Sequence, residues 1–149
     1  MSIRGTNMRL IHAYEIFDFI QKSETPEELE TNLRKYGNHS PINYLLSMNF
    51  NKNIVVDLPS GIPETEKLDA TVHPDMMHPL ATQITRMRLC FVDSKLSKIK
   101  KEKVFLDIIE CIPFKEVEVL VSCKDKALTE MYPAITKELV ESVFPSFVA

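Results

Sequence analysis

Apolar residues recur every three or four positions through most of the chain, which is the spacing of one buried helix face. The pattern predicts short amphipathic helices over residues 8–22, 26–36, 41–49, 80–93, 95–112, 113–123 and 137–144. The range 113–123 also fits a strand, because Val117, Val119 and Val121 alternate. We interpret it as a helix, since Val117, Leu120 and Val121 share one helical face. An all-α fold is therefore expected.

Capping residues mark the ends of several of these helices. Thr25, Pro26 and Glu28 occupy the N-cap, first and third positions of a helix start, where the hydroxyl and the carboxylate can each bond a free backbone N–H. Gly37 is expected to end this helix at a positive φ. Further expected caps precede the helices at 8, 41 and 137: Asn7, Ser40 and Thr136.

The helical pattern is absent between residues 50 and 79, where four prolines and Gly61 interrupt the chain. Its one strand-like piece is Ile54-Val55-Val56. A connection of this length in a small domain is either functional or wrapped around the surface. We therefore predict a single globular domain over residues 1–149, a compact all-α bundle of about six to seven short helices with a long irregular, Pro-rich loop at about 50–79.

Composition narrows the class of protein. The chain holds 149 residues, of which 44% are hydrophobic and 26% charged, and this balance excludes a disordered tail, a collagen-like fibre and a disulfide-rich toxin. No stretch approaches ~18 consecutive apolar residues, so no membrane-spanning helix is expected. The three cysteines, Cys90, Cys111 and Cys123, lie far apart in apolar segments. We interpret them as reduced core residues of a protein in a reducing cytoplasm.

Charge is unevenly distributed along the chain. The net charge is −3, but residues 86–103 carry seven basic and two acidic side chains and are +5, so the remainder is −8. The candidate nucleic-acid-binding or partner-binding residues are Arg86, Arg88, Lys95, Lys98, Lys100, Lys101 and Lys103. The alternative is a solvated helix face that pairs with the acidic remainder. No aromatic residue lies between Lys95 and Lys103, so a stacking platform for single strands is missing there.

The segment from His73 to Pro79 is the one candidate for metal chemistry. His73, Asp75 and His78 are ligand types for zinc or non-haem iron, but their spacing matches no recognised metal signature. A site would need a further ligand from elsewhere, such as His12, His39 or Asp69. Loop histidines beside proline are more often exposed turn residues, so no cofactor is expected.

Motifs for other enzymatic chemistry are missing from the sequence. It holds no Gly-x-Ser-x-Gly, no Walker-type phosphate loop and no Gly-x-Gly-x-x-Gly, and its three isolated glycines cannot build one. We therefore expect a protein that is not an enzyme.

The C-terminal tail, Glu141–Ala149, is apolar and contains Phe144 and Phe147. Such a tail can dock into a hydrophobic pocket of a partner. More often it folds back and completes the core of its own domain. In both cases truncation should matter.

Several stretches resemble a small family of T-even-like tailed phages, including cyanophages, that is known as a domain of unknown function. The matching stretches are Tyr14–Phe17, Val56–Pro63, Lys101–Glu110, Lys124–Lys126, Thr136–Val140 and Phe144–Pro145. The resemblance implies a phage protein in the host cytoplasm, or in the virion, and it implies no established activity or catalytic residue.

Three functions follow as expectations. The first is an interaction protein that binds phage or host machinery through the basic helix and the 50–79 loop. The second is a nucleic-acid-binding accessory protein that uses residues 86–103. The third is a metal-dependent enzyme centred on His73, Asp75 and His78. No membrane partner is expected.

Overall fold

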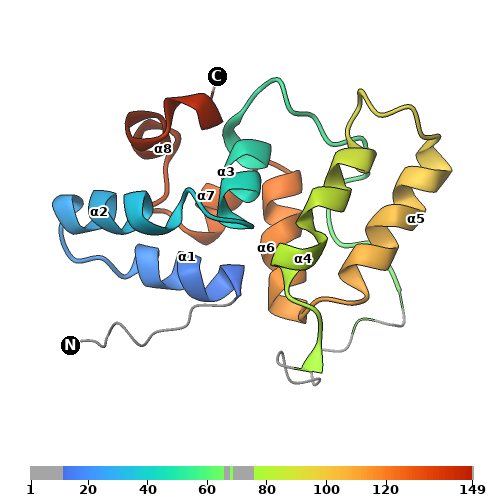
Figure 1. Ribbon diagram of the computed structural model, residues 1–149, viewed down its shortest axis with the longest axis horizontal. Helices are drawn as coiled ribbons and strands as arrows, with labels where there is room; N and C mark the ends of the chain where they lie inside the picture. Colours follow the sequence, from blue (N-terminus) through green and yellow to red (C-terminus); the bar gives the residue numbers. More distant parts are fainter. Residues whose placement is uncertain (1–11, 66–67, 69–75, 149) are drawn as a thin grey trace.

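Helices dominate the computed structural model, which describes residues 12–65, 68 and 76–148 (Figure 1). This part of the chain holds eight α-helices and two 3-10 helices: α1 (Ala13–Gln21), α2 (Pro26–Tyr36), α3 (Ile42–Phe50), α4 (Leu80–Gln83), η3 (Ile84–Cys90), α5 (Lys98–Ile109), α6 (Phe114–Lys124), α7 (Leu128–Met131), α8 (Lys137–Val143) and η4 (Pro145–Phe147). The prediction of an all-α fold is confirmed. The short helix α7 was not predicted.

Two helix starts follow their local signals. The Thr25 hydroxyl accepts a hydrogen bond from the Glu28 backbone N–H at 3.1 Å, Pro26 occupies the first turn, and α2 has the predicted bounds. The Thr136 hydroxyl likewise accepts from the Leu139 N–H at 3.2 Å at the start of α8. Both caps act over three residues, which is why the sequence alone was sufficient to predict them.

Three details of the predicted helix ends are wrong. Gly37 is the C-cap of α2, as predicted, but its φ of −70° is not the expected positive angle. Ser40 makes no cap, because Pro41 is itself the N-cap of α3. Helix α1 begins at Ala13 with His12 as its N-cap, several residues later than predicted, and Asn7 lies outside the described residues.

The predicted helix over residues 80–93 is α-helical only as far as Gln83. It continues as the 3-10 helix η3 and ends at Cys90. The next helix, α5, begins at Lys98 rather than 95, because the Ser97 hydroxyl accepts a hydrogen bond from the Lys100 N–H at 3.3 Å and caps it there. The ambiguous range 113–123 is helical, as interpreted.

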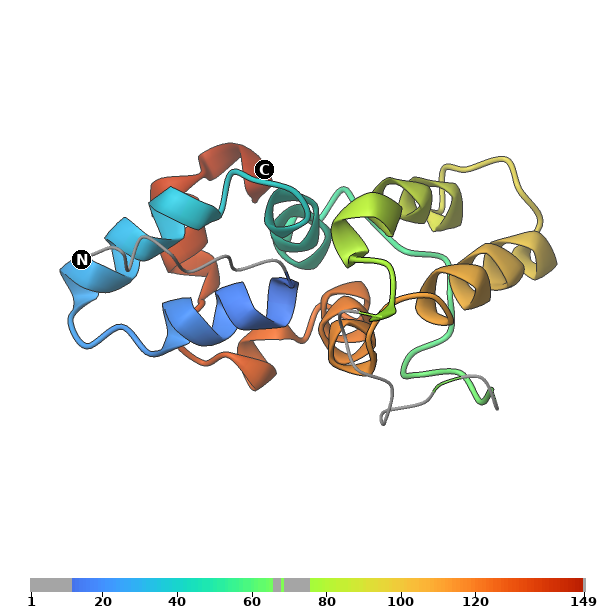
Figure 2. The same ribbon diagram turned by 60° about the horizontal axis from the view of Figure 1, so that its bottom comes forward.

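Helices α3 and α6 lie in the middle of the molecule (Figures 1 and 2). Helices α1, α2 and α8 lie on one side of them, and η3 and α5 pack against each other on the opposite side. Most of α6 is buried, with Val117, Val119 and Leu120 fully covered. A helix covered on nearly all sides carries apolar residues on nearly all sides, which explains why its valines also fit a strand.

The long connection between α3 and α4 is largely irregular in its described part. Val56 forms an isolated antiparallel bridge with Phe91, where Asp57 N–H donates to Cys90 O at 2.8 Å and Val92 N–H donates to Val55 O at 2.9 Å. The strand-like piece at Ile54 therefore runs along the end of η3 and helps to shape the surface there. No helix in the described part of the chain could span a membrane.

Candidate functional site

The seven basic candidates between Arg86 and Lys103 do not form one surface. Lys101 is 2% exposed, and its Nζ donates to Asp57 Oδ2 at 2.9 Å. This hydrogen bond lowers the pKa of the Asp57 carboxyl. Lys101 was expected to contact a phosphate or a partner, but the structure buries it. The reason is the carboxylate of Asp57, which is far from Lys101 in the sequence but lies beside it on the central loop and compensates the charge of the buried ammonium.

The two arginines of the segment differ in their surroundings. Arg86 is partly exposed and directs its guanidinium to Gln83 Oε1 at 3.0 Å and Asp107 Oδ2 at 3.8 Å. Arg88 is exposed and makes no ion pair with a residue that the structure describes. Four lysines of the segment are exposed as well: Lys95, Lys98, Lys100 and Lys103. Of these, Lys98 lies 3.9 Å from Asp57 Oδ1.

The C-terminal tail is folded back onto the domain. The rings of Phe144 and Phe147 stack with their centroids 4.7 Å apart, and η4 packs against α3 and α8. Val148 is buried with the core, while Phe147 stays partly exposed. Of the two interpretations of the tail, the structure therefore has the one in which it completes its own core.

Arg88 and Phe147 line the same hollow, although they are far apart in the sequence. The hollow has a volume of about 300 Å³ and is lined by Asn43, Tyr44, Ser47, Ile54, Arg88, Phe91 and Phe147. It therefore combines a residue of the basic segment, a residue of the tail and a residue of the central loop. The sequence indicated these three regions separately but could not indicate that they meet.

Two further hollows adjoin the first at Phe91. One, of about 570 Å³, is lined by Thr85, Arg86, Arg88, Leu89, Phe91, Asp93 and Ser94. The other, of about 180 Å³, is lined by Asn53, Ile54, Val55, Phe91, Val92 and Asp93. We call the surface around the shared ring the Phe91 face and define it by Tyr44, Ile54, Val55, Arg88, Leu89, Phe91, Val92 and Phe147.

Aliphatic side chains are unusually exposed on the Phe91 face. Val55, Leu89 and Val92 are 47%, 46% and 57% exposed. The predicted apolar stripe keeps its register as far as Met87, but in the tighter turn of η3 Cys90 rather than Phe91 is the next fully buried residue. The sequence analysis did not single out Leu89 and Val92. The available signal for an exposed apolar surface was that residues 80–93 contain more apolar residues than one buried helix face can hold.

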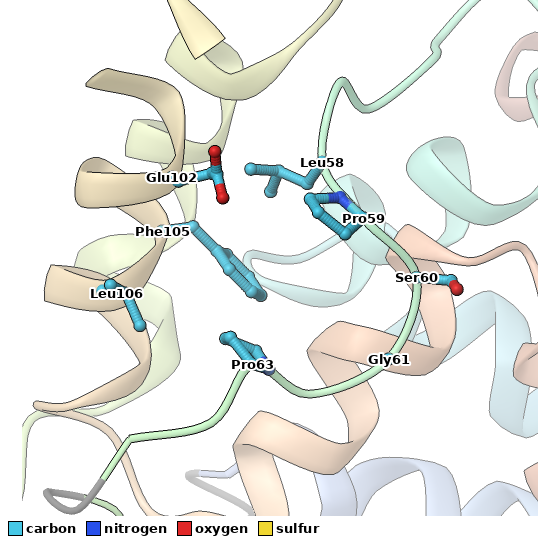
Figure 3. Close-up of a pocket in the computed structure, with 8 residues that line it drawn as sticks. All are labelled: Leu58, Pro59, Ser60, Gly61, Pro63, Glu102, Phe105 and Leu106. Carbon is cyan, nitrogen blue, oxygen red and sulfur yellow. The ribbon is translucent and has the colours of Figure 1, made fainter. Parts of the chain in front are cut away.

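A smaller hollow lies between α5 and the central loop, where the loop turns (Figure 3). Its volume is about 70 Å³, and it is lined by Leu58, Pro59, Ser60, Gly61, Pro63, Glu102, Phe105 and Leu106. Figure 3 shows the ring of Phe105 directed from α5 into the space between Pro59 and Pro63. We call residues 58–63 the anchored turn.

Charged residues at the end of α6 hold the anchored turn. Lys124, whose side chain is 1% exposed, donates from Nζ to Pro59 O and to Asp125 Oδ1, each at 2.6 Å. The Gly61 N–H in turn donates to Asp125 Oδ2 at 2.8 Å. Gly61 has a φ of +81°, a backbone conformation that glycine adopts at low cost. Two side chains therefore hold a surface turn at two of its residues, Pro59 and Gly61.

The next residue, Lys126, extends the same set of contacts to α3. Its Nζ donates to the carbonyl oxygens of Met48 at 2.9 Å and of the C-cap residue Asn51 at 3.0 Å, at the end of the helix where carbonyl groups lack intrahelical partners. Partial burial lowers the pKa of the Lys126 ammonium. The run Lys124–Lys126 thus joins the anchored turn, α6 and α3.

Residues 16–130 match the model of a protein family, DUF6433, which is described as a family of unknown function. The chain belongs to the DUF6433 family. The match ends before α8 and η4, so this DUF6433 protein supplies Phe147 from outside the matched stretch. No curated protein and no solved structure matches the chain.

The histidine segment gives no metal centre in the described residues of this DUF6433 protein. His73 and Asp75 lie outside the described residues, and His78 is exposed. Of the further candidate ligands, His12 is buried near Glu116, His39 is exposed and Asp69 lies outside the described residues. Within the described residues, no three His, Cys, Asp or Glu side chains group as a metal site would.

One buried ionisable pair joins α1 to α6. Glu116 is fully buried, and its Oε1 accepts from the Ala13 N–H at 2.8 Å and lies 3.2 Å from His12 Nδ1. Burial raises the pKa of the Glu116 carboxyl to about 7. Neither His12 nor Glu116 lines a hollow described above, and the pair holds the start of α1 against α6.

Proposed function

We propose that this DUF6433 protein is a non-enzymatic interaction protein of a tailed phage and that it binds a phage or host protein in the host cytoplasm during infection. The Phe91 face is the proposed binding surface. The observation that carries the proposal is the meeting of three hollows at one partly exposed aromatic ring, with exposed aliphatic side chains around it.

The composition of the Phe91 face supports a protein as the ligand. Binding energy in protein interfaces is concentrated in aromatic and arginine side chains that lie near the centre of the contact. Phe91, Tyr44 and Arg88 have this character and line one hollow. Exposed apolar residues that gather on one surface, rather than singly, are typical of interaction sites.

The surroundings of the cysteines support the non-enzymatic part of the proposal. Burial raises the pKa of Cys90 to about 11, and it also raises the pKa of Cys111 and Cys123. A catalytic cysteine needs the opposite shift, because the thiolate is the nucleophile. The phage setting rests on the resemblance of the stretches Lys101–Glu110 and Lys124–Lys126, which the anchored turn brings close together.

A nucleic acid is the alternative ligand, and four exposed lysines favour it: Lys95, Lys98, Lys100 and Lys103. Two observations favour a protein instead. The four lysines line none of the three hollows, so their charges lie outside the Phe91 face. The exposed groups next to Arg88 include the aliphatic Leu89, whereas nucleic-acid interfaces are polar and strongly basic.

The test is capture of a partner from lysate of phage-infected cells, with the tagged protein and three matched variants. Val92→Glu places a charge on the Phe91 face, and Met131→Glu places one at an exposed methionine of α7. A protein that is captured after nuclease treatment by the natural chain and by Met131→Glu, but not by Val92→Glu, supports the proposal. Loss with Met131→Glu alone contradicts the assignment of the face.

The third variant addresses the nucleic-acid alternative. It replaces Lys98 and Lys100, which line none of the hollows of the Phe91 face, by glutamate. If nuclease abolishes capture and this variant captures nothing, the basic segment binds nucleic acid and the proposal is wrong.

A further inference from the structure

The Phe91 face contains a guanidinium group, that of Arg88, for which no hydrogen bond or ion pair to a described residue is found. Arg88 lies on η3, is exposed and forms no ion pair with the described residues, whereas Arg86 is directed to Asp107 at 3.8 Å. The Arg88 side chain lines two of the three hollows, which meet at the Phe91 ring. An unpaired guanidinium therefore lies at the junction of the binding surface.

The backbone that carries Arg88 is fixed on both sides. Its carbonyl oxygen accepts from the Phe91 N–H at 3.3 Å, and the neighbouring Cys90 carbonyl accepts from Asp57 N–H at 2.8 Å. The Val56–Phe91 bridge holds the central loop against the same residues. A ligand that pairs with Arg88 consequently meets a surface whose backbone positions are already set, which lowers the ordering cost of binding.

The chemistry of a guanidinium beside aromatic rings selects a carboxylate that is attached to an apolar group. Guanidinium and carboxylate form two parallel hydrogen bonds, and this geometry is stronger and more specific than a single contact. Tyr44, Phe91 and Phe147 line the hollow of about 300 Å³ beside Arg88, which is large enough for one leucine or phenylalanine side chain.

The charges around the face agree with an acidic ligand and orient it. Of the charged residues that line the three hollows, Arg86 and Arg88 are basic and Asp93 is acidic, so their net charge is +1 within a chain of −3. Asp93 lines the other two hollows but not the hollow that Arg88 shares with Phe147, so it would repel a carboxylate outside that hollow. The acidic group of the ligand is therefore directed toward Arg88, and its apolar group toward Phe147.

We propose that the ligand of the Phe91 face is a protein segment in which aspartates or glutamates flank a leucine or a phenylalanine. A carboxylate of this segment pairs with Arg88, and the apolar side chain enters the hollow between Phe91 and Phe147. This inference rests on the proposed function, because it names the chemistry of the partner at the same surface.

The experiment titrates the full-length protein with four fluorescein-labelled probes while amide resonances are followed by NMR. The first probe is a peptide of about ten residues in which glutamates flank a central leucine and phenylalanine. The second has lysines in place of the glutamates, and the third has serines in place of the leucine and phenylalanine. The fourth is a single-stranded deoxythymidine oligonucleotide. Binding of the first peptide alone, with shifts at the Phe91 face, is the expected result.

Two variants of Arg88 and one control separate the contributions. Arg88→Gln removes the charge and is expected to weaken the first peptide about tenfold or more. Arg88→Lys keeps the charge without the paired donors and is expected to have an intermediate affinity. Lys100→Gln removes a charge from an exposed residue outside the three hollows and should change affinity by less than about twofold.

The unfavourable outcomes distinguish an error in the proposed ligand from an error in the proposed function. If the lysine peptide binds the face equally well, or if Arg88→Gln leaves affinity unchanged while Leu89→Ser abolishes it, the acidic partner is wrong and the interaction surface remains. If no peptide shifts the resonances of the Phe91 face, the proposed ligand and the proposed binding surface are both wrong. If only the oligonucleotide shifts them, the face binds nucleic acid and both are replaced.

Discussion

The buried carboxyl of Glu116 makes the stability of the protein depend on pH. Its pKa is raised from 4.5 to about 7 by burial, so the folded state holds its proton more tightly than the unfolded state does. Stability from this group is fully present below about pH 4.5 and is lost as the pH rises through about 7. The loss is at most about 3.5 kcal/mol, since each pKa unit corresponds to about 1.4 kcal/mol.

The variant Glu116→Gln tests this dependence, because an amide keeps an acceptor for the Ala13 N–H and cannot ionise. We expect the free energy of unfolding of the natural protein to fall between about pH 5 and about pH 8 by more than that of the variant. Urea unfolding at the two pH values measures the difference. Glu118→Gln, on the exposed side of the same helix, is the control. Equal pH profiles for Glu116→Gln and the natural protein would contradict the assignment.

Gly37 is required for a close approach and not for its backbone angle. A Cβ at this position would lie 2.5 Å from Cε2 of Phe144 and 2.6 Å from Leu33 O. Gly37→Ala is therefore expected to cost about 1–3 kcal/mol of stability, the usual cost of overpacking. Gly61→Ala is the matched control, because it is strained by a φ of +81° but meets no described atom within 4 Å.

The double variant Gly37→Ala/Phe144→Leu separates crowding from strain. A smaller side chain at residue 144 relieves the contact with the new methyl group, so the two changes should be less costly together than the sum of the single changes. Phe144→Leu combined with Gly61→Ala should show simple additivity. Additivity in both pairs, measured by urea unfolding, would show that Phe144 does not limit the size of the side chain at residue 37.

The lysine at the end of α6 links one helix to a surface turn. Lys124→Met keeps the apolar stem but removes the ammonium that bonds Pro59 O and Asp125 Oδ1. We expect a loss of about 2 kcal/mol, the usual contribution of a charged hydrogen bond, together with NMR shifts throughout the anchored turn. Lys103→Met on the exposed side of α5 serves as control. A stable variant with an unchanged turn spectrum would refute the anchoring role.

Local determinants explain which elements were predictable. Helix α2 has its predicted bounds because Thr25 and Pro26 act within one turn. Helix α1 was predicted to begin too early, because its first N–H is bonded by Glu116, which lies 103 residues from Ala13. Distances of this kind are set by tertiary packing and leave no trace in a single sequence.

The candidate site shows the same division between local and distant causes. Threefold spacing placed Lys98 and Lys101 on one face of a helix, but spacing alone could not tell which side of α5 would be buried. The ion pair with Asp57 on the central loop explains why Lys101 lies on the buried side of α5. The basic segment, the tail and the loop were each predictable as features, whereas their meeting at Arg88 and Phe147 required the structure.

The alkylation rates of the three cysteines measure how readily different parts of the folded protein unfold. Cys90 and Cys123 are fully buried, whereas Cys111 is partly exposed. Alkylation of the native protein should therefore modify Cys111 first, and Cys90 and Cys123 should react about a thousandfold more slowly, because they need global unfolding. Peptide mapping by mass spectrometry after timed exposure to iodoacetamide measures the three rates. Equal rates in the native protein would show that α6 opens without unfolding, and equal rates in concentrated urea are the control.

The hollow of the Phe91 face has one wall that lies outside the stretch matched by the family. Residues 16–130 contain Arg88 and Phe91, but the wall of the hollow that Phe147 provides lies beyond them. A relative with the same matched stretch and a different last turn would present the same guanidinium beside a recess of another shape. Under the proposed function, the choice of partner would change with this one wall, while Arg88 and Phe91 of the matched stretch stay the same.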